Sequence, residues 1–261
     1  MARREIPRKV LVGFVAIGAL TATPALSAPP AAPDWTGFYL DGGIGYQNDN
    51  FNWAYAPIQP NVAWSESKGS ASWTAHIGYQ QQFSWLVVGA ELGGFRSMGG
   101  NWATKFSGTN PINAPCGTAL SFQCQAAINY GTDLAGGKLG VDWRNWLFYA
   151  VGGVAFNANI ASQIVNPAGG LFDVGSSAAA HGWYIGGGFD YLLLKSKPID
   201  LIAGVEYEHV QLGNVAECSV QTGGATFCPG SLSASNYSRT LSASQNAVWV
   251  KLTVKWNPFN Y

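Results

Sequence analysis

Histidines are the side chains in this sequence most able to carry acid–base chemistry. There are three of them, His76, His181 and His209. A hydrolase of the serine type needs a serine and an acidic residue presented together with a histidine. The stretch His209-Val210-Gln211 has no serine two residues after the histidine. We therefore interpret the histidines as isolated polar residues, and we expect no catalytic site, metal or cofactor.

Charged residues are the other candidates, and they are scarce. The 261 residues include 14 Lys+Arg and 14 Asp+Glu, or 11% charged, against about 25% in an average soluble domain. A chain without basic excess is not expected to bind nucleic acid. With 48% apolar residues it is not expected to be disordered either. Such a chain is not expected to present most of its surface to water.

The N-terminus has the pattern of a secretory leader. Four basic residues between positions 3 and 9 precede an apolar run at 10–20, and small residues follow up to Ala28. We expect 1–28 to be a signal peptide, 29–34 a short periplasmic segment and 35–261 the folded domain. No later run of 18 apolar residues occurs, so no spanning helix is expected.

Four cysteines form two local pairs, Cys116 with Cys124 and Cys218 with Cys228. In a secreted chain, even numbers and short spacings favour disulfides. Each bond would close a loop of roughly ten residues and contribute ~2–3 kcal/mol by restricting the unfolded chain. A metal site is the alternative. It is disfavoured because the surrounding loops lack histidine and the spacings match no zinc pattern.

Alternation of apolar and polar residues is the main structural signal. In 247–256, Val248, Val250, Leu252 and Val254 fall on one face, and Lys251 and Lys255 fall on the other. This period of two predicts a strand, because a helix would scatter the same residues. Similar patterns predict seven further strands. The eight expected strands are 36–47, 71–80, 85–95, 131–141, 146–156, 182–192, 201–209 and 247–256.

The connections between these strands alternate strictly between long and short. Outer-membrane barrels have long outer loops and short periplasmic turns. The sequence thus predicts an all-β fold, an eight-stranded antiparallel up-and-down transmembrane β-barrel with four long outer loops. A soluble barrel is the alternative, but one or two charges per strand are too few to coat an exterior. Tryptophans at strand ends fit interfacial girdles, namely Trp35, Trp73, Trp85, Trp146 and Trp256.

The polar strand faces then point into a narrow lumen. Opposite charges on neighbouring strands lie within pairing reach, so Asp41 is expected to flank Lys251 and Lys255. Glu206 or Glu208 is expected on the other side of the same lysines. The expected lumen network comprises Asp41, His76, Glu91, Lys138, Asp190, Glu206, Glu208, Lys251 and Lys255.

Within this network, Glu91 is expected to face Lys138 across the third and fourth strands. The interior of an eight-stranded barrel is just wide enough to be filled by side chains. An open diffusion pore through one chain is therefore not expected.

Three segments carry a family resemblance. The segment 35–40 (WTGFYL) with GIGY at 43–46 resembles the opening strand of the small alphaproteobacterial outer-membrane proteins of the porin-like, opacity-type family. The segments 146–156 and 183–191 are similar to that family's fifth and sixth strands. The end of the chain departs from the family. Pro258 interrupts the alternation, and Tyr261 stands where members have a terminal Phe that serves as a cue for the barrel-assembly machinery.

The preferred functional interpretation is an integral outer-membrane protein with a mainly structural, envelope-stabilising and surface-interaction role. Both termini would be periplasmic, and the partners would be outer-membrane lipid, lipopolysaccharide and the barrel-assembly machinery. Homo-oligomerisation is left open. The alternatives are a porin for small hydrophilic solutes and loop-mediated ligand or adhesion binding. The latter would use aromatic residues in 49–64 and 96–125, namely Phe51, Trp53, Tyr55, Trp64, Trp102 and Phe106.

Overall fold

The computed structural model describes most of the predicted domain. The described residues are 34–55, 63–99, 103–105, 123–165, 171–175, 178–196, 198–217, 219–221, 226–227 and 239–258. Every regular element in these ranges is a β-strand. Across the same ranges, there is no helix of the length and apolarity needed to cross a membrane.

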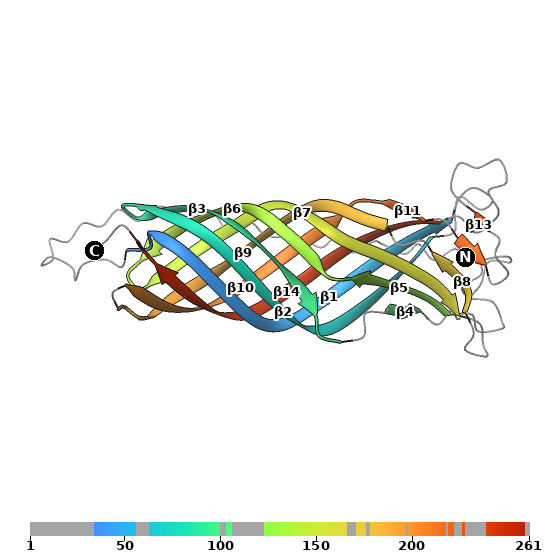
Figure 1. Cartoon of the computed structure of the whole chain (residues 1–261), viewed down its shortest axis with the longest axis horizontal. Coiled ribbons are helices and arrows are strands. Elements are labelled where there is room, and N and C mark those ends of the chain that lie inside the picture. The colour runs from blue at the N-terminus through green and yellow to red at the C-terminus, as the bar shows by residue number, and fades with distance from the viewer. Residues whose placement is uncertain are drawn as a thin grey trace, which may run out of the picture. The chain divides into compact units, whose positions relative to one another are not determined.

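Eight long strands close into a ring (Figure 1). Each pairs antiparallel with the next, and the last pairs with the first from Phe38↔Trp256 to Tyr55↔Arg239. The predicted eight-stranded up-and-down barrel is therefore confirmed. In ring order the strands are β1 (Gly37–Tyr55), β2 (Ala63–Phe83), β3 (Leu86–Ser97), β6 (Thr132–Trp143), β7 (Trp146–Val165), β9 (Ala178–Leu194), β10 (Ile199–Leu212) and β14 (Arg239–Trp256).

Six shorter strands extend the wall at one end of the barrel, on the right in Figure 1. β5 pairs with β7, and β11 pairs with β14. These strands lie in stretches that the sequence predicts as outer loops, so parts of those loops continue the sheet. The six are β4 (Ala103–Lys105), β5 (Gln123–Asn129), β8 (Leu171–Gly175), β11 (Val215–Glu217), β12 (Ser219–Gln221) and β13 (Thr226–Phe227).

Short connections join the strands at the opposite end. Two-residue turns link β2 to β3 and β6 to β7, and their first residues, Ser84 and Arg144, have φ of 59° and 60°. Positive φ at this position marks the primed turns, whose twist matches that of paired strands. The described N-terminal and C-terminal ends lie at this same end, because Phe38 pairs with Trp256 and Gly37 pairs with Gln80.

The outward face of the ring carries a continuous zone of exposed apolar side chains, here called the apolar belt. On β1 this zone runs from Phe38 to Tyr46. About nine residues is close to what a tilted strand needs to cross a bilayer. The exposed members include Leu40, Ile44, Ile77, Val88, Leu92, Leu139, Val154, Ile185, Val250 and Leu252.

Aromatic side chains border the apolar belt on both sides. Near the short turns, Trp146 lies 4.7 Å from Tyr191 and Phe38 lies 5.9 Å from Trp256, measured between ring centroids. Phe83, Trp85 and Trp143 are exposed at the same end, and a second exposed row contains Tyr46, Trp73, Trp183 and Tyr207. Two such girdles are typical of strands that cross a membrane.

Polar residues begin directly beyond the second girdle. An outward ion pair joins Arg96 to Asp133, with an Nη2 to Oδ1 distance of 2.5 Å. Burial raises the pKa of Asp133, but the hydrogen bonds from Arg96 and Asn157 and the charge of Arg96 outweigh it, so the pKa lies below its ordinary value. Charge thus returns to the outer surface where the apolar belt ends.

Candidate functional site in the barrel lumen

The end of the barrel that carries the short turns, here called the base, is closed by a tryptophan from the N-terminal segment. Trp35 is buried; its indole N–H donates to Asp142 Oδ1 at 3.0 Å, and its backbone N–H donates to Gln82 Oε1 at 2.7 Å. Gln80 Nε2 donates to the Trp35 carbonyl at 2.8 Å. The prediction that Trp35 belongs to an interfacial girdle was therefore wrong. A buried indole needs a hydrogen-bond acceptor, and the lumen supplies one.

The middle of the lumen is organised around Lys251. Its Nζ lies 2.6 Å from Glu206 Oε2 and 3.4 Å from Asp41 Oδ2. Asp41 Oδ1 is in turn 3.0 Å from His76 Nδ1. The Tyr149 hydroxyl donates to Glu206 Oε2 at 2.5 Å. All five side chains are buried, so these contacts satisfy charges that water does not reach.

Two further groups extend this cluster across the lumen. Lys138 Nζ lies 3.2 Å from Asp190 Oδ2 and 3.8 Å from the centre of the Tyr149 ring. Glu91 accepts hydrogen bonds from the hydroxyls of Tyr39, at 2.8 Å, and Tyr184, at 3.3 Å. Sequence reasoning placed Glu91 opposite Lys138, whereas the structure gives each another partner. Long side chains reach past their neighbouring strand in a narrow lumen, so the nearest strand does not decide the partner.

Lys255 also differs from expectation. It lies at the base of the barrel, with Nζ 2.9 Å from Asp200 Oδ2 and hydrogen bonds to the carbonyls of Asp34 and Thr36. Four residues along a strand separate it from Lys251, which is about 13 Å of extended chain. Asp41 therefore pairs with Lys251 and lies out of reach of Lys255.

Glycine on the inward face makes room for two of these side chains. A Cβ atom added at Gly93 would lie 2.0 Å from Cδ2 of His76. One added at Gly188 would lie 2.7 Å from the Tyr149 hydroxyl and 2.3 Å from the Val205 carbonyl oxygen. These strand glycines therefore permit the close approach of large lumen groups.

The outer part of the lumen is packed mainly with apolar side chains. Phe51, Trp53 and Phe95 are buried there. The Trp53 indole N–H donates to Glu66 Oε1 at 2.9 Å. The sequence placed Phe51 and Trp53 in an outer loop, where the alternative of loop-mediated binding would use them, and that placement was wrong. The alternation of β1 continues to Tyr55, so these side chains turn inward.

Tyrosines and an acid were missed by sequence reasoning. Tyr149 and Tyr184 each join lumen carboxylates, and Asp200 holds Lys255. The alternation along each strand could have indicated that the two tyrosines point into the lumen, because they alternate with the outward apolar residues of their strands. All nine members of the expected lumen network lie buried on the inward face.

Several predicted features fall outside the described residues. These are the signal peptide, Trp102, Phe106, the chain terminus at Tyr261 and the cysteines Cys116, Cys218 and Cys228. For Tyr55 and Trp64 only the backbone is described, as part of β1 and β2. For Cys124 only the backbone is described, as part of β5. The two disulfides remain a prediction.

Comparisons with known proteins give structural likenesses without a sequence family. No family model and no curated protein sequence matches the chain. Neisserial surface protein A is 12% identical, with 85% of this chain and 98% of that chain covered and a TM-score of 0.30.

The outer membrane protease OmpT of Escherichia coli is 6% identical, with 89% of this chain and 99% of that chain covered and a TM-score of 0.47. Ail of Yersinia pestis is 6% identical, with 81% of this chain and 98% of that chain covered and a TM-score of 0.28. None of these scores reaches 0.5, so the fold assignment rests on this chain's own strand pairings.

Proposed function

We propose that this protein is an integral outer-membrane β-barrel with a structural, envelope-stabilising role. The observation that carries the proposal is the apolar belt between two aromatic girdles on a closed ring of strands. A soluble barrel points its apolar face inward, whereas this ring exposes residues such as Ile44 (67% exposed) and Val250 (64%) outward. Only lipid gives such a surface a favourable environment.

The lumen supports a structural role over transport. Trp35 closes the base, the lysine–carboxylate cluster crosses the middle, and Phe51 with Trp53 fills the outer part. Small eight-stranded barrels are filled in this way. Porin-like transport of small hydrophilic solutes would need this packing to open, and it remains the alternative function.

The same geometry underlies the remaining parts of the proposal. Outer-membrane lipid and lipopolysaccharide would contact the apolar belt, and the barrel-assembly machinery would insert the protein. Short turns lie at the same end as both described chain ends, which supports a periplasmic position for the termini. The family resemblance at 35–46, 146–156 and 183–191 fits membership of the opacity-type proteins. Loop-mediated ligand or adhesion binding is the second alternative function.

We infer a non-enzymatic role from the histidines. His76 is buried in the lumen, and His209 faces outward, bonded to Asn246 at 2.9 Å and packed 5.6 Å from the Trp183 ring. Among the described contacts, neither histidine is paired with a serine hydroxyl. A serine–histidine–acid arrangement at the membrane surface therefore has no support from these contacts.

Two measurements test the proposed function. The membrane-embedded barrel should migrate as a compact species in cold detergent and shift on boiling, and a chain without any shift would contradict the barrel in membranes. In planar bilayers the refolded protein should give no steady single-channel steps. A variant with Tyr149, Glu206 and Lys251 changed to alanine should conduct more than an outward Val248→Ala control. Large, steady steps from the unmodified protein would favour the porin alternative.

A further inference from the structure

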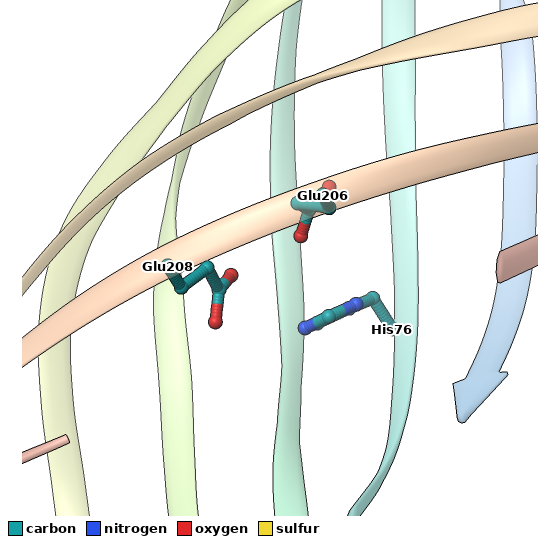
Figure 2. Close-up of side chains that lie close together, drawn as sticks. All are labelled: His76, Glu206 and Glu208. Carbon is teal, nitrogen blue, oxygen red and sulfur yellow. The ribbon is translucent and has the colours of Figure 1, made fainter. Parts of the chain in front are cut away.

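Three potential metal ligands converge in the middle of the lumen. A ring nitrogen of His76 and carboxylate oxygens of Glu206 and Glu208 all lie within 4.8 Å of one another. Figure 2 shows both carboxylates and the imidazole directed into the same space. His76 comes from β2, and the two glutamates come from β10, three strands away around the ring. The cluster therefore connects separate parts of the barrel wall.

The glutamates present unused acceptors to this space. Among the described residues, no donor group hydrogen-bonds either carboxylate oxygen of Glu208, although its side chain is completely buried. Glu206 uses Oε2 for Lys251 and Tyr149, and its Oε1 accepts no hydrogen bond from a donor in the described part of the chain. Burying a carboxylate without a partner costs free energy. A cation or a proton in this space would therefore stabilise the two glutamates.

The hydrogen bonds of His76 leave one ring nitrogen available as a metal ligand. Its Nδ1 lies 3.0 Å from Asp41 Oδ1, which holds the proton on that nitrogen. The Thr74 hydroxyl lies 3.4 Å from Nε2 but donates its only proton to the Gly94 carbonyl at 3.1 Å. The Nε2 lone pair is then available. A histidine fixed by a carboxylate in this way is a recurrent support for metal ligation.

The charge balance of the middle lumen points the same way. Five buried carboxyl groups lie there with two buried lysines, which gives an excess of three negative charges when every carboxyl group is ionised and His76 is neutral. A divalent cation would reduce this excess to one. The carboxylates are those of Asp41, Glu91, Asp190, Glu206 and Glu208, and the lysines are Lys138 and Lys251.

We propose that His76, Glu206 and Glu208 form a binding site for a first-row divalent transition-metal ion such as Zn²⁺, with Asp41 orienting the imidazole. One imidazole nitrogen with two carboxylates suits such ions better than Ca²⁺ or Mg²⁺, which prefer oxygen ligands alone. Metal–ligand bonds of about 2.0–2.2 Å require the three side chains to draw together by rotation. Because the site is buried, the ion enters while the barrel folds and then joins β2 to β10.

The test is metal retention after refolding. The full chain is unfolded in urea with EDTA, its cysteines are alkylated so that they bind no metal, and it is refolded into detergent with Zn²⁺ or with chelator. After desalting, the folded protein should retain about one Zn²⁺ per chain, as a single structural site requires. X-ray absorption should show one nitrogen at about 2.0 Å together with oxygen ligands.

Matched variants locate the ion. Glu208→Gln should lower Zn²⁺ retention at least fivefold, whereas Glu91→Gln, at a lumen carboxylate outside the cluster, should leave it unchanged. Cold-detergent mobility checks that each variant is folded. Folded unmodified protein that retains no Zn²⁺ would overturn the proposal and favour a proton shared between Glu206 and Glu208. Full retention in Glu208→Gln would also overturn it.

Discussion

Replacing Lys251 by methionine tests whether the lumen cluster holds the barrel together. The substitution removes the cation that lies 2.6 Å from Glu206 and 3.4 Å from Asp41 but keeps a side chain of similar length. Both carboxylates are about 1% exposed, so water cannot replace the lost partner. The variant must either bury uncompensated charge or take up protons.

The structure sets the size of this effect. Removing one partner of a buried ion pair typically costs about 3–5 kcal/mol. Protonating one carboxyl group of ordinary pKa costs about 4 kcal/mol at pH 7. This cost is an upper limit on the unfolding free energy lost for each carboxylate that no longer has its lysine partner. We therefore expect the Lys251→Met barrel to lose about 3–5 kcal/mol of unfolding free energy at pH 7. The loss should shrink toward pH 4.5, because acid supplies the protons that the variant needs.

Urea unfolding in lipid vesicles, followed by tryptophan fluorescence, measures this loss. Lys255→Met is the matched control, because Lys255 lies on the same strand and face but pairs with the more exposed Asp200 at the barrel base. It should lose less than half as much. A Lys251→Met loss below about 1 kcal/mol, the range of a surface pair, or a loss independent of pH would refute the reasoning.

Three further predictions follow from the described contacts. Leu252→Arg in the apolar belt should cost about 2–4 kcal/mol in vesicles, whereas Asn246→Arg beyond the belt should cost about 0–1, and equal costs would argue against a depth-dependent lipid contact. Asp133→Asn should cost about 0.2–1 kcal/mol above pH 4, as for an exposed pair. Because the folded pKa of Asp133 is lowered, its contribution should be complete above the unfolded pKa and vanish as the pH falls through the folded one, so a pH-independent difference would count against the ion pair. Trp35→Ala should lower the unfolding free energy by about 3 kcal/mol or more through a cavity and the lost hydrogen bond to Asp142 Oδ1, and a loss below about 1 kcal/mol would show that Trp35 does not close the base.

The alternation in segments such as 247–256 was enough to predict the strands, their faces and their closure into an eight-stranded ring. Period two fixes which side chains share a face, so Lys251 was expected inside. The sequence could not predict which inward side chains pair with each other across the lumen. Lys138 meets Asp190, 52 residues away, because the tilt of the barrel and the reach of side chains decide which inward groups meet.

The position of Trp35 could not be predicted either. A tryptophan at a strand end suits an interfacial girdle and a buried lumen equally well. Its acceptor, Asp142, is 107 residues away in the chain and becomes its neighbour only once the barrel closes. Likewise, Phe51 and Trp53 were placed in a loop because no sequence signal marked where β1 ends.

Spin-label accessibility along the outward faces of β1 and β14 tests the central claim most directly. Single labels replace Ile44 and Val250 in the apolar belt and Asn48 and Ser244 beyond it, in protein refolded into lipid vesicles. Labels at Ile44 and Val250 should be accessible to oxygen and shielded from a water-soluble nickel reagent, and those at Asn48 and Ser244 should show the reverse. Equal exposure of all four positions to the nickel reagent would contradict a barrel that meets lipid with its apolar belt.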